Sequence, residues 1–347
     1  MHVEIELVRR AMRSTMDAAW GSTSQRELVL VTLRDADGRE GYGEAAPLPG
    51  YDGVTLADTL QALEDCRAVL EDADGEDRGL VLSRCAQCIV VAPELAAIDL
   101  ALWDLEGRRR GLPVWQLLDA EDPSQVAVNY TIASGDRAGA AGEAGWARAA
   151  GFHCLKLKVG TGDDAGRLAA VRAAAGPDMA IRLDANGAWD VEQARAALRV
   201  LAPAGIECCE EPVHGAEAIE TLDALTVVAL ALDESTAEPG ALDHRRCAAA
   251  CLKVSRCGGI SGLIDGARRA RRAGYEVYLA STLDGPLGIA AALHAAALVA
   301  PERPCGLATL DLFGSVPEGL RVSGGAMSPP PGPGLGDGLR EWYGPAV

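Results

Sequence analysis

The chain has 347 residues, and its 32 Lys+Arg against 50 Asp+Glu give a formal net charge of −18. A chain this acidic lacks the basic face that neutralises phosphates, so we expect neither a nucleic-acid partner nor a membrane partner. Its 49% hydrophobic and 24% charged residues are ordinary for a folded protein, and its length predicts about two domains, or one large α/β barrel with an addition.

Targeting and membrane segments are not expected. The N-terminus alternates apolar and charged residues and has no signal-peptide core. The longest apolar run, Leu287–Ala300, is too short to span a bilayer and contains His294, so it predicts a buried, alanine-rich helix. A chain of this length needs no disulfide framework, so its ten cysteines are expected to be reduced, and the cytoplasm is the expected location.

The first part of the chain predicts an α+β domain over residues 1–115. Glu27–Asp35 has the alternation of a strand, and Glu40–Glu44 can pair back with it after an Asp-Gly turn. Thr55–Leu70 and Pro93–Arg110 have helical apolar spacing. Strands followed by helices, without alternation, are typical of an α+β unit.

From residue 116 to 321 the pattern predicts a TIM-type α/β barrel. Short apolar strands recur about every 21 to 28 residues, which is the length of one βα unit. A doubly wound sheet is the competing architecture, but the glycine-rich phosphate turn that it needs is absent. Residues 322–347, which are rich in proline and glycine, are expected to form an extended segment returning to the first domain. The eight expected strands are Val126–Ala133, Cys154–Val159, Ala180–Asp184, Ile206–Glu211, Val228–Asp233, Ala250–Ser255, Tyr275–Ser281 and Cys305–Thr309.

Charged residues stand at the carboxyl ends of five successive barrel strands, where barrel enzymes carry their active sites. Three neighbouring carboxylates repel one another unless a cation lies among them, and oxygen-only ligands suit Mg²⁺. Strands two and six lie across the barrel mouth from each other, so their lysines are expected to face each other. In chain order these residues are Lys156 and Lys158, Asp184, Glu210, Asp233 and Lys253.

This arrangement predicts proton abstraction next to a carboxylate. A substrate carboxylate on the metal would acidify the adjacent carbon, Lys158 would remove its proton, and the metal and Lys253 would stabilise the enediolate. Lys156 is a like charge that would lower the pKa of Lys158. Taken singly, the Lys-x-Lys pair is typical of a solvated edge strand and Asp184 of a helix N-cap. The combined order of charges favours a site.

The chain resembles the enolase superfamily, in its muconate-lactonizing-enzyme subgroup. That resemblance implies a (β/α)7β barrel with an N-terminal α+β capping domain, and Mg²⁺ held by Asp184, Glu210 and Asp233. It also implies acid/base roles for Lys158 and Lys253, leaves Glu211 unassigned, and predicts a shortened helix after strand five. The matching stretches are GYGEAAPLPGY (41–51), IDLALWDLEG (98–107), FHCLKLKVG (152–160), IRLDANGAW (181–189), EEPV (210–213), LDES (232–235), LKVSRCGGISG (252–262) and STLDGPLGIAAALHAA (281–296).

Within the subgroup, residues 306–312 resemble o-succinylbenzoate synthases. Dipeptide epimerases carry an Asp-x-Asp pair in this region, where this chain has either Thr309 with Asp311 or Asp311 with Phe313, so one acid is missing. Arg182 resembles an arginine that holds the succinyl carboxylate in those synthases, although a buried structural ion pair is an equal alternative. The other expected substrate-binding residues are Asn186, Ser281 and Thr309.

The resulting expectation is a Mg²⁺-dependent lyase, similar to o-succinylbenzoate synthase of menaquinone biosynthesis, that eliminates water in the syn sense. The alternatives are a racemase or epimerase of N-acyl amino acids or dipeptides, a muconate cycloisomerase, and a non-catalytic relative that keeps the barrel as a binding protein. The expected partner is a small-molecule carboxylate substrate, and a homo-oligomer is left open. Ser14–Gly21 and Pro47–Gly53 are expected lid loops over the barrel mouth.

Overall fold

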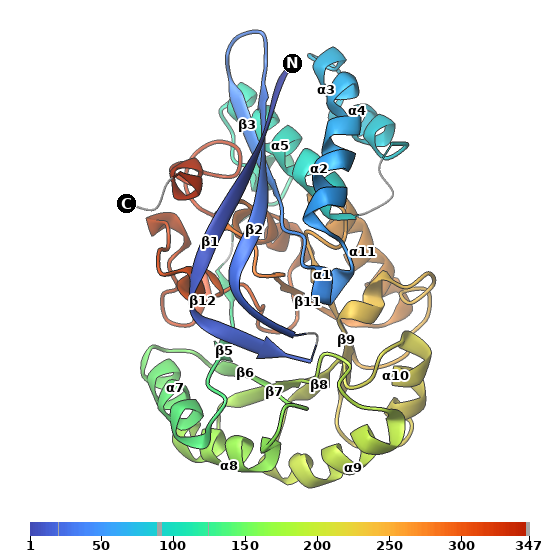
Figure 1. The fold of residues 1–347 in the computed structure, drawn as a ribbon, viewed down its shortest axis with the longest axis vertical. Helices are drawn as coiled ribbons and strands as arrows, with labels where there is room; N and C mark the ends of the chain where they lie inside the picture. The colour runs from blue at the N-terminus through green and yellow to red at the C-terminus, as the bar shows by residue number, and fades with distance from the viewer. Residues whose placement is uncertain (20, 89–91, 124, 345–347) are drawn as a thin grey trace.

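A computed structural model describes residues 1–19, 21–88, 92–123 and 125–344. The first domain is a three-stranded antiparallel sheet covered by helices (Figure 1). Its strands are β1 (His2–Ala18), β2 (Gly21–Arg34) and β3 (Glu40–Ala45), and its helices are α1 (Pro49–Asp52), α2 (Leu56–Asp65), α3 (Arg67–Asp72), α4 (Arg78–Cys85) and α5 (Ala92–Arg110).

The glycines of the Gly-Tyr-Gly-Glu stretch let helix α5 lie directly on strand β3. A Cβ atom on Gly43 would lie 2.0 Å from the carbonyl oxygen of Ala97, and one on Gly41 would lie 2.4 Å from that of Ala101. The expected pairing of Glu40–Glu44 with the preceding strand is confirmed, since Leu30 pairs with Glu44 in the antiparallel register.

The expected lid loop Ser14–Gly21 is wrong as a loop, because the strands continue through it. Strand β1 runs to Ala18 and pairs with β2 as far as Gly21, although the register shifts between Ala11 and Met16. Residue 20 lies outside the described residues. The segment is therefore the end of a long hairpin, which Figure 1 shows descending from the first domain toward the barrel strands.

The second domain is a parallel barrel, and the expected fold class is confirmed. Seven strands follow in the order β11-β10-β9-β8-β7-β6-β5, and helices surround them (Figure 1). The strands are β5 (Tyr130–Ile132), β6 (Cys154–Lys158), β7 (Ala180–Asp184), β8 (Cys208–Glu210), β9 (Leu230–Leu232), β10 (Ala249–Lys253) and β11 (Glu276–Ala280). The helices are α6 (Val114–Leu117), α7 (Arg137–Ala149), α8 (Asp164–Ala175), α9 (Val191–Leu201), α10 (Ala216–Asp223), α11 (Ile260–Ala273) and α12 (Pro286–Val299).

The expected eighth strand, Cys305–Thr309, is much shorter than predicted. Among the described residues, two single bridges close the barrel, from Cys305 to Val128 and from Gly306 to Ala280. Thr309 already precedes a 3-10 helix, Leu310–Phe313, so the extended backbone ends early. The expected shortening after the fifth strand is confirmed, because the turn of 3-10 helix Glu234–Ala237 stands where the other units have an α-helix.

The last part of the chain returns to both domains. Strand β12 (Ala326–Met327) pairs antiparallel with β4 (Val126–Ala127). Beyond it, the amide of Leu335 donates to Asp104 of helix α5 at 2.7 Å, and Arg10 of β1 donates to the carbonyl of Trp342. The boundaries at 115 and 321 remain predictions.

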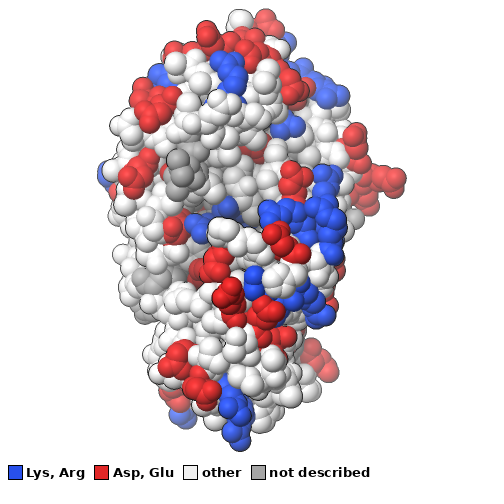
Figure 2. Space-filling model, turned by 90° about the vertical axis from the view of Figure 1, so that its right-hand side faces the viewer, with Lys and Arg blue, Asp and Glu red and all other residues white. Residues whose placement is uncertain are grey.

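Within the described residues, no helix combines the length and the apolar composition required to cross a membrane. The face drawn in Figure 2 carries basic side chains interspersed with acidic ones. All ten cysteines are free thiols.

His294, which is fully buried on helix α12, makes folding sensitive to acid. Its Nδ1 accepts from the amide of Trp115 at 3.3 Å and its Nε2 lies 3.2 Å from the carbonyl oxygen of Leu335, so both contacts suit the neutral ring. Burial lowers the pKa of His294 to about 4. The unfolded chain therefore takes up this proton first as the pH falls, and the free energy of unfolding should drop between pH 6.5 and 4 by about 3 kcal/mol.

The variant His294→Gln keeps one acceptor and one donor but cannot bind this proton. Urea unfolding of both proteins between pH 4 and 8 should show a shallower acid loss in the variant. An identical pH dependence in the two proteins would contradict the assignment.

Candidate active site

Adjacent strands bring lysines and carboxylates together at the barrel mouth. Lys158 of β6 pairs in register with Asp184 of β7, which pairs with Glu210 of β8. The Lys158 ammonium lies 2.7 Å from Asp184 Oδ2. The Lys156 ammonium lies between two carboxylates, 2.8 Å from Asp184 Oδ2 and 2.6 Å from Glu210 Oε1. The strand pairing therefore brings these four predicted residues together.

Lys253 lies on the other side of the same space, at the end of β10. Its Nζ donates to Asp233 Oδ2 at 2.7 Å and to the hydroxyl of Tyr51 at 2.6 Å. That hydroxyl donates to Asp233 Oδ1 at 2.9 Å. Tyr51 belongs to helix α1 of the capping domain, so the expected lid segment Pro47–Gly53 reaches the site.

The chain has only three lysines, and all three are in this site. The other 29 of its 32 basic residues are arginines. A guanidinium stays protonated at any physiological pH, whereas an amine can release and accept a proton. Each lysine of the chain therefore lies where an amine could exchange a proton with a substrate.

Burial and neighbouring charges act against each other on these groups. Burial lowers the pKa of Lys156, but Asp184 and Glu210 more than offset it, so the pKa lies well above its usual value. The pKa of Lys253 is raised in the same way by Asp233. Burial raises the pKa of Glu210. The neighbouring carboxylates of Asp184 and Asp233 raise this pKa further, whereas the Lys156 ammonium lowers it.

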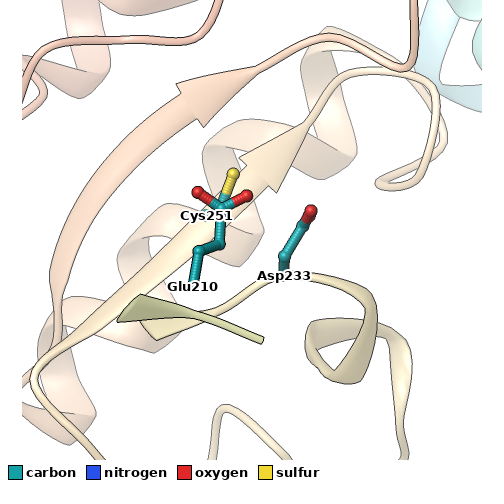
Figure 3. A group of neighbouring side chains, drawn as sticks. All are labelled: Glu210, Asp233 and Cys251. Atoms are coloured by element: carbon teal, nitrogen blue, oxygen red, sulfur yellow. The ribbon is translucent and has the colours of Figure 1, made fainter. Parts of the chain in front are cut away.

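The carboxylates fit a divalent metal. Ligand atoms of Glu210, Asp233 and Cys251 lie within 4.8 Å of one another, and Figure 3 shows the three side chains rising from neighbouring parts of the barrel. Burial and the adjacent acids raise the pKa of Cys251, so it remains a neutral thiol and a poor partner for a hard cation. The two carboxylates supply the oxygen ligands that Mg²⁺ prefers, and the predicted third ligand, Asp184, lies across the Lys156 ammonium from Glu210.

These groups surround a cavity of about 60 Å³. The capping domain contributes Met16, Leu48 and Tyr51 to its wall. Predicted site residues form most of the rest, namely Lys156, Lys158, Asp184, Asn186, Asp233, Lys253, Ser281 and Thr309. Met16, Lys158 and Thr131 also line a neighbouring cavity of about 230 Å³.

Three predicted substrate-binding residues lie at the cavity in a polar network. Asn186 accepts from Lys158 and donates to Glu234 Oε1 at 2.8 Å. The hydroxyls of Ser281 and Thr309 are 2.9 Å apart. Their role with a substrate remains a prediction.

The structure does not bring Arg182 to the cavity. It is fully buried, 4.1 Å from the ring of Tyr278, and donates to the carbonyl of Pro304 at 3.2 Å and to Glu207 at 3.4 Å. Arg182 pairs in register with Lys156, two residues or roughly 6.6 Å along the strand from the level of Asp184. The Lys156 ammonium reaches Asp184 and Glu210, whereas the Arg182 guanidinium is held by Tyr278, Pro304 and Glu207. The structure corresponds to the alternative reading, a buried structural ion pair.

Sequence reasoning missed Tyr51, Glu234 and the function of Glu211. Tyr51 ends the stretch GYGEAAPLPGY, but only the tertiary structure places its hydroxyl on Lys253. Glu211 is a positioning residue: its carboxylate accepts from the amides of Asp233 at 2.7 Å and Ser235 at 3.1 Å. It thereby orients the backbone that carries Asp233.

Comparison with known families identifies both domains. Residues 2–119 match the mandelate racemase/muconate lactonizing enzyme N-terminal domain, and residues 140–342 match the enolase C-terminal domain-like family. The chain belongs to the enolase superfamily, in the mandelate racemase/muconate lactonizing enzyme subgroup. The expected superfamily and subgroup are thus confirmed.

The similar proteins are isomerases. A hydrophobic dipeptide epimerase of Enterococcus faecalis is 30% identical over 312 residues, covering 86% of each chain. Muconate cycloisomerase 1-1 of Acinetobacter lwoffii is 32% identical over 333 residues, covering 90% of this chain and 87% of that protein. The crystal structure of a Cytophaga hutchinsonii dipeptide epimerase, complexed with Mg and D-Ala-L-Val, superposes with a TM-score of 0.90 at 25% identity, covering 98% and 97% of the two chains. These relatives support the racemase or epimerase alternative better than the dehydratase reading.

Proposed function

We propose that this superfamily member is a Mg²⁺-dependent racemase or epimerase that moves the α-proton of an N-acylated amino acid. The observation that carries the proposal is the pair Lys158 and Lys253, which approach one cavity from opposite strands of the barrel. One amine on each face of a carbon can remove a proton from one side and return a proton to the other.

The metal would be held by Asp184, Glu210 and Asp233. When bound, a divalent cation supplies a Lewis acid that makes the proton next to a carboxylate more acidic. The residues of the chain do the rest. Lys158 and Lys253 exchange the proton at their Nζ atoms, Lys156 supplies a fixed positive charge, and Tyr51 and Met16 keep water away from the reacting carbon.

The small number of carboxylates at the cavity favours a substrate with an acylated amino group over one with a free ammonium. Among the described residues that line it, the only carboxylates are the proposed ligands Asp184 and Asp233. Asp311, the remaining acid of the Thr-x-Asp pair, is exposed and lines a different hollow. Thr131, Ser281 and Thr309 instead offer neutral hydroxyls, which suit an amide.

Syn dehydration by an enzyme similar to o-succinylbenzoate synthase is the second candidate. The stretch at residues 306–312 favours it, and it would use the same metal site and Lys158. It differs in the role of Lys253, which would provide charge alone.

The direct test is deuterium exchange followed by NMR with Mg²⁺ in D₂O. N-acetyl and N-succinyl forms of both amino-acid enantiomers should lose the α-proton signal and yield the opposite enantiomer. Dipeptides with a free N-terminus should react more slowly, and the cyclohexadiene substrate of the synthase should not dehydrate. Absence of exchange with every compound would contradict an enzyme of this class and favour the non-catalytic relative.

A further inference from the structure

Arg26 of strand β2 joins the two domains through backbone carbonyls alone. Its side chain is 2% exposed and its guanidinium donates to four carbonyl oxygens. Two belong to the capping domain and two to the barrel segment that follows strand β11. The acceptors are Pro47 at 2.6 Å, Ala46 at 2.8 Å, Thr282 at 3.2 Å and Leu283 at 3.4 Å.

This placement is costly for a charged group. Within the described residues, Arg26 forms no salt bridge, although Asp284, Asp52 and Glu44 lie near enough to influence it. Burying a charge without a directly paired carboxylate opposes folding unless hydrogen bonds compensate for the lost water. A planar guanidinium supplies several donors in fixed directions, so it can hold four carbonyls in one arrangement.

The four carbonyls border the active-site cavity. On the capping side, Ala46 and Pro47 lead directly into Leu48 and Tyr51, which line it. On the barrel side, Thr282 and Leu283 are themselves part of its wall. Arg26 does not line the cavity, so it cannot act on a substrate by contact.

The barrel segment needs external support. Leu283 has a φ of 59°, in the left-handed region that is unfavourable for a residue with a Cβ atom. Such a conformation persists where the surroundings fix it, and it often lies at functional sites. The hydrogen bond from Arg26 to the Leu283 carbonyl is one such constraint.

We propose that Arg26 is a positioning residue that locks the lid segment 46–53 against the cavity wall at Thr282 and Leu283. It thereby holds Leu48 and Tyr51 at the cavity, with the Tyr51 hydroxyl in contact with Lys253. The catalytic consequence rests on the proposed function, but the locking itself can be measured without any substrate.

The first experiment is amide hydrogen–deuterium exchange followed by mass spectrometry on the full-length variants Arg26→Gln and Arg26→Lys. Residues 46–53 should exchange at least roughly tenfold faster in Arg26→Gln, because the lid loses its anchor. The exchange rate of strand β10 should be unchanged, and Arg26→Lys should be intermediate since an ammonium cannot span four carbonyls. Arg109→Gln is the matched control, because Arg109 binds Asp35 and Asp74 inside the capping domain.

The second experiment is a double-mutant cycle on α-proton exchange with Tyr51→Ala. Misplacing a lid by about 1 Å can slow a reaction roughly 10²-fold, so Arg26→Gln should lower the rate strongly alone. It should have little further effect in the Tyr51→Ala background, because the two act through one segment. The effects of Arg109→Gln and Tyr51→Ala should multiply.

Faster exchange confined to the lid, together with the non-additive rates, would support the proposal. Unchanged exchange in residues 46–53 would overturn it, and so would faster exchange throughout the chain, which indicates a general structural role. Independent effects of Arg26→Gln and Tyr51→Ala would also overturn it. If no compound is turned over, the proposed function fails, and the hydrogen-exchange experiment alone decides on the lock.

Discussion

Replacing either Lys158 or Lys253 by methionine should strongly reduce racemisation yet leave one half of the exchange reaction. In a two-base mechanism each amine serves one face of the α-carbon. A variant with one lysine can still remove and return the α-proton of the enantiomer whose α-proton points toward that lysine. Conversion to the opposite enantiomer should fall by roughly 10²- to 10⁴-fold, the usual effect of losing a proton-transfer group.

The measurement is NMR exchange of separate L and D substrates with each variant, and the two variants should show opposite preferences. Arginine variants refine the test, because guanidinium cannot give up its proton. Lys158→Arg should lose racemisation in the two-base mechanism and dehydration in the one-base mechanism. Lys253→Arg should lose racemisation in a racemase, but it should keep dehydration activity in a one-base dehydratase.

Arg268→Met is a matched control for these variants, since it truncates an exposed cation that pairs with Asp265 outside the site. It should be fully active, and circular dichroism should show the same fold for all variants. An active Lys158→Arg variant would show that the base is not Lys158 and that its assignment to strand β6 is wrong.

Glu210→Gln should remove Mg²⁺ binding and all turnover. Glu210 is fully buried, and its two oxygens accept from Lys156 and from the hydroxyl of Tyr278 at 2.8 Å. The amide nearly preserves the shape but halves the acceptors and removes the charge. Losing a residue that only orients a metal ligand costs about 10- to 100-fold in metal affinity, so losing a ligand should cost at least about 100-fold.

Isothermal titration with Mg²⁺ measures this loss, and Asp184→Asn should behave alike. Glu207→Gln is the matched control. Glu207 directly precedes strand β8, at the end away from Glu210, and it binds Arg182 and Arg303. Its Mg²⁺ affinity should be that of the unaltered protein. Full activity of the unaltered protein in EDTA would rule out the metal assignment.

Much of the fold follows from local patterns. The alternation in Glu27–Asp35 and the regular recurrence of apolar strands each report a periodicity that local backbone geometry imposes. The same reliance on local pattern makes the predicted eighth strand longer than the observed one. Apolar residues at 305–309 satisfy a strand pattern, but pairing requires neighbours on both sides, and the backbone turns into a 3-10 helix at Leu310.

The sequence by itself determined the subgroup, the barrel and the order of Lys158, Asp184, Glu210, Asp233 and Lys253, because parallel strands bring their carboxyl ends to one mouth. Only the tertiary structure decided which residues lie one layer deeper and which distant segments complete the site. Arg182 shares a strand face with Asp184 but is buried against Tyr278. Tyr51 is 202 positions from Lys253 and donates to and accepts from the groups around it. Periodicity specifies the face of a strand on which a side chain lies, whereas depth in the barrel and contact between domains depend on how the whole chain packs.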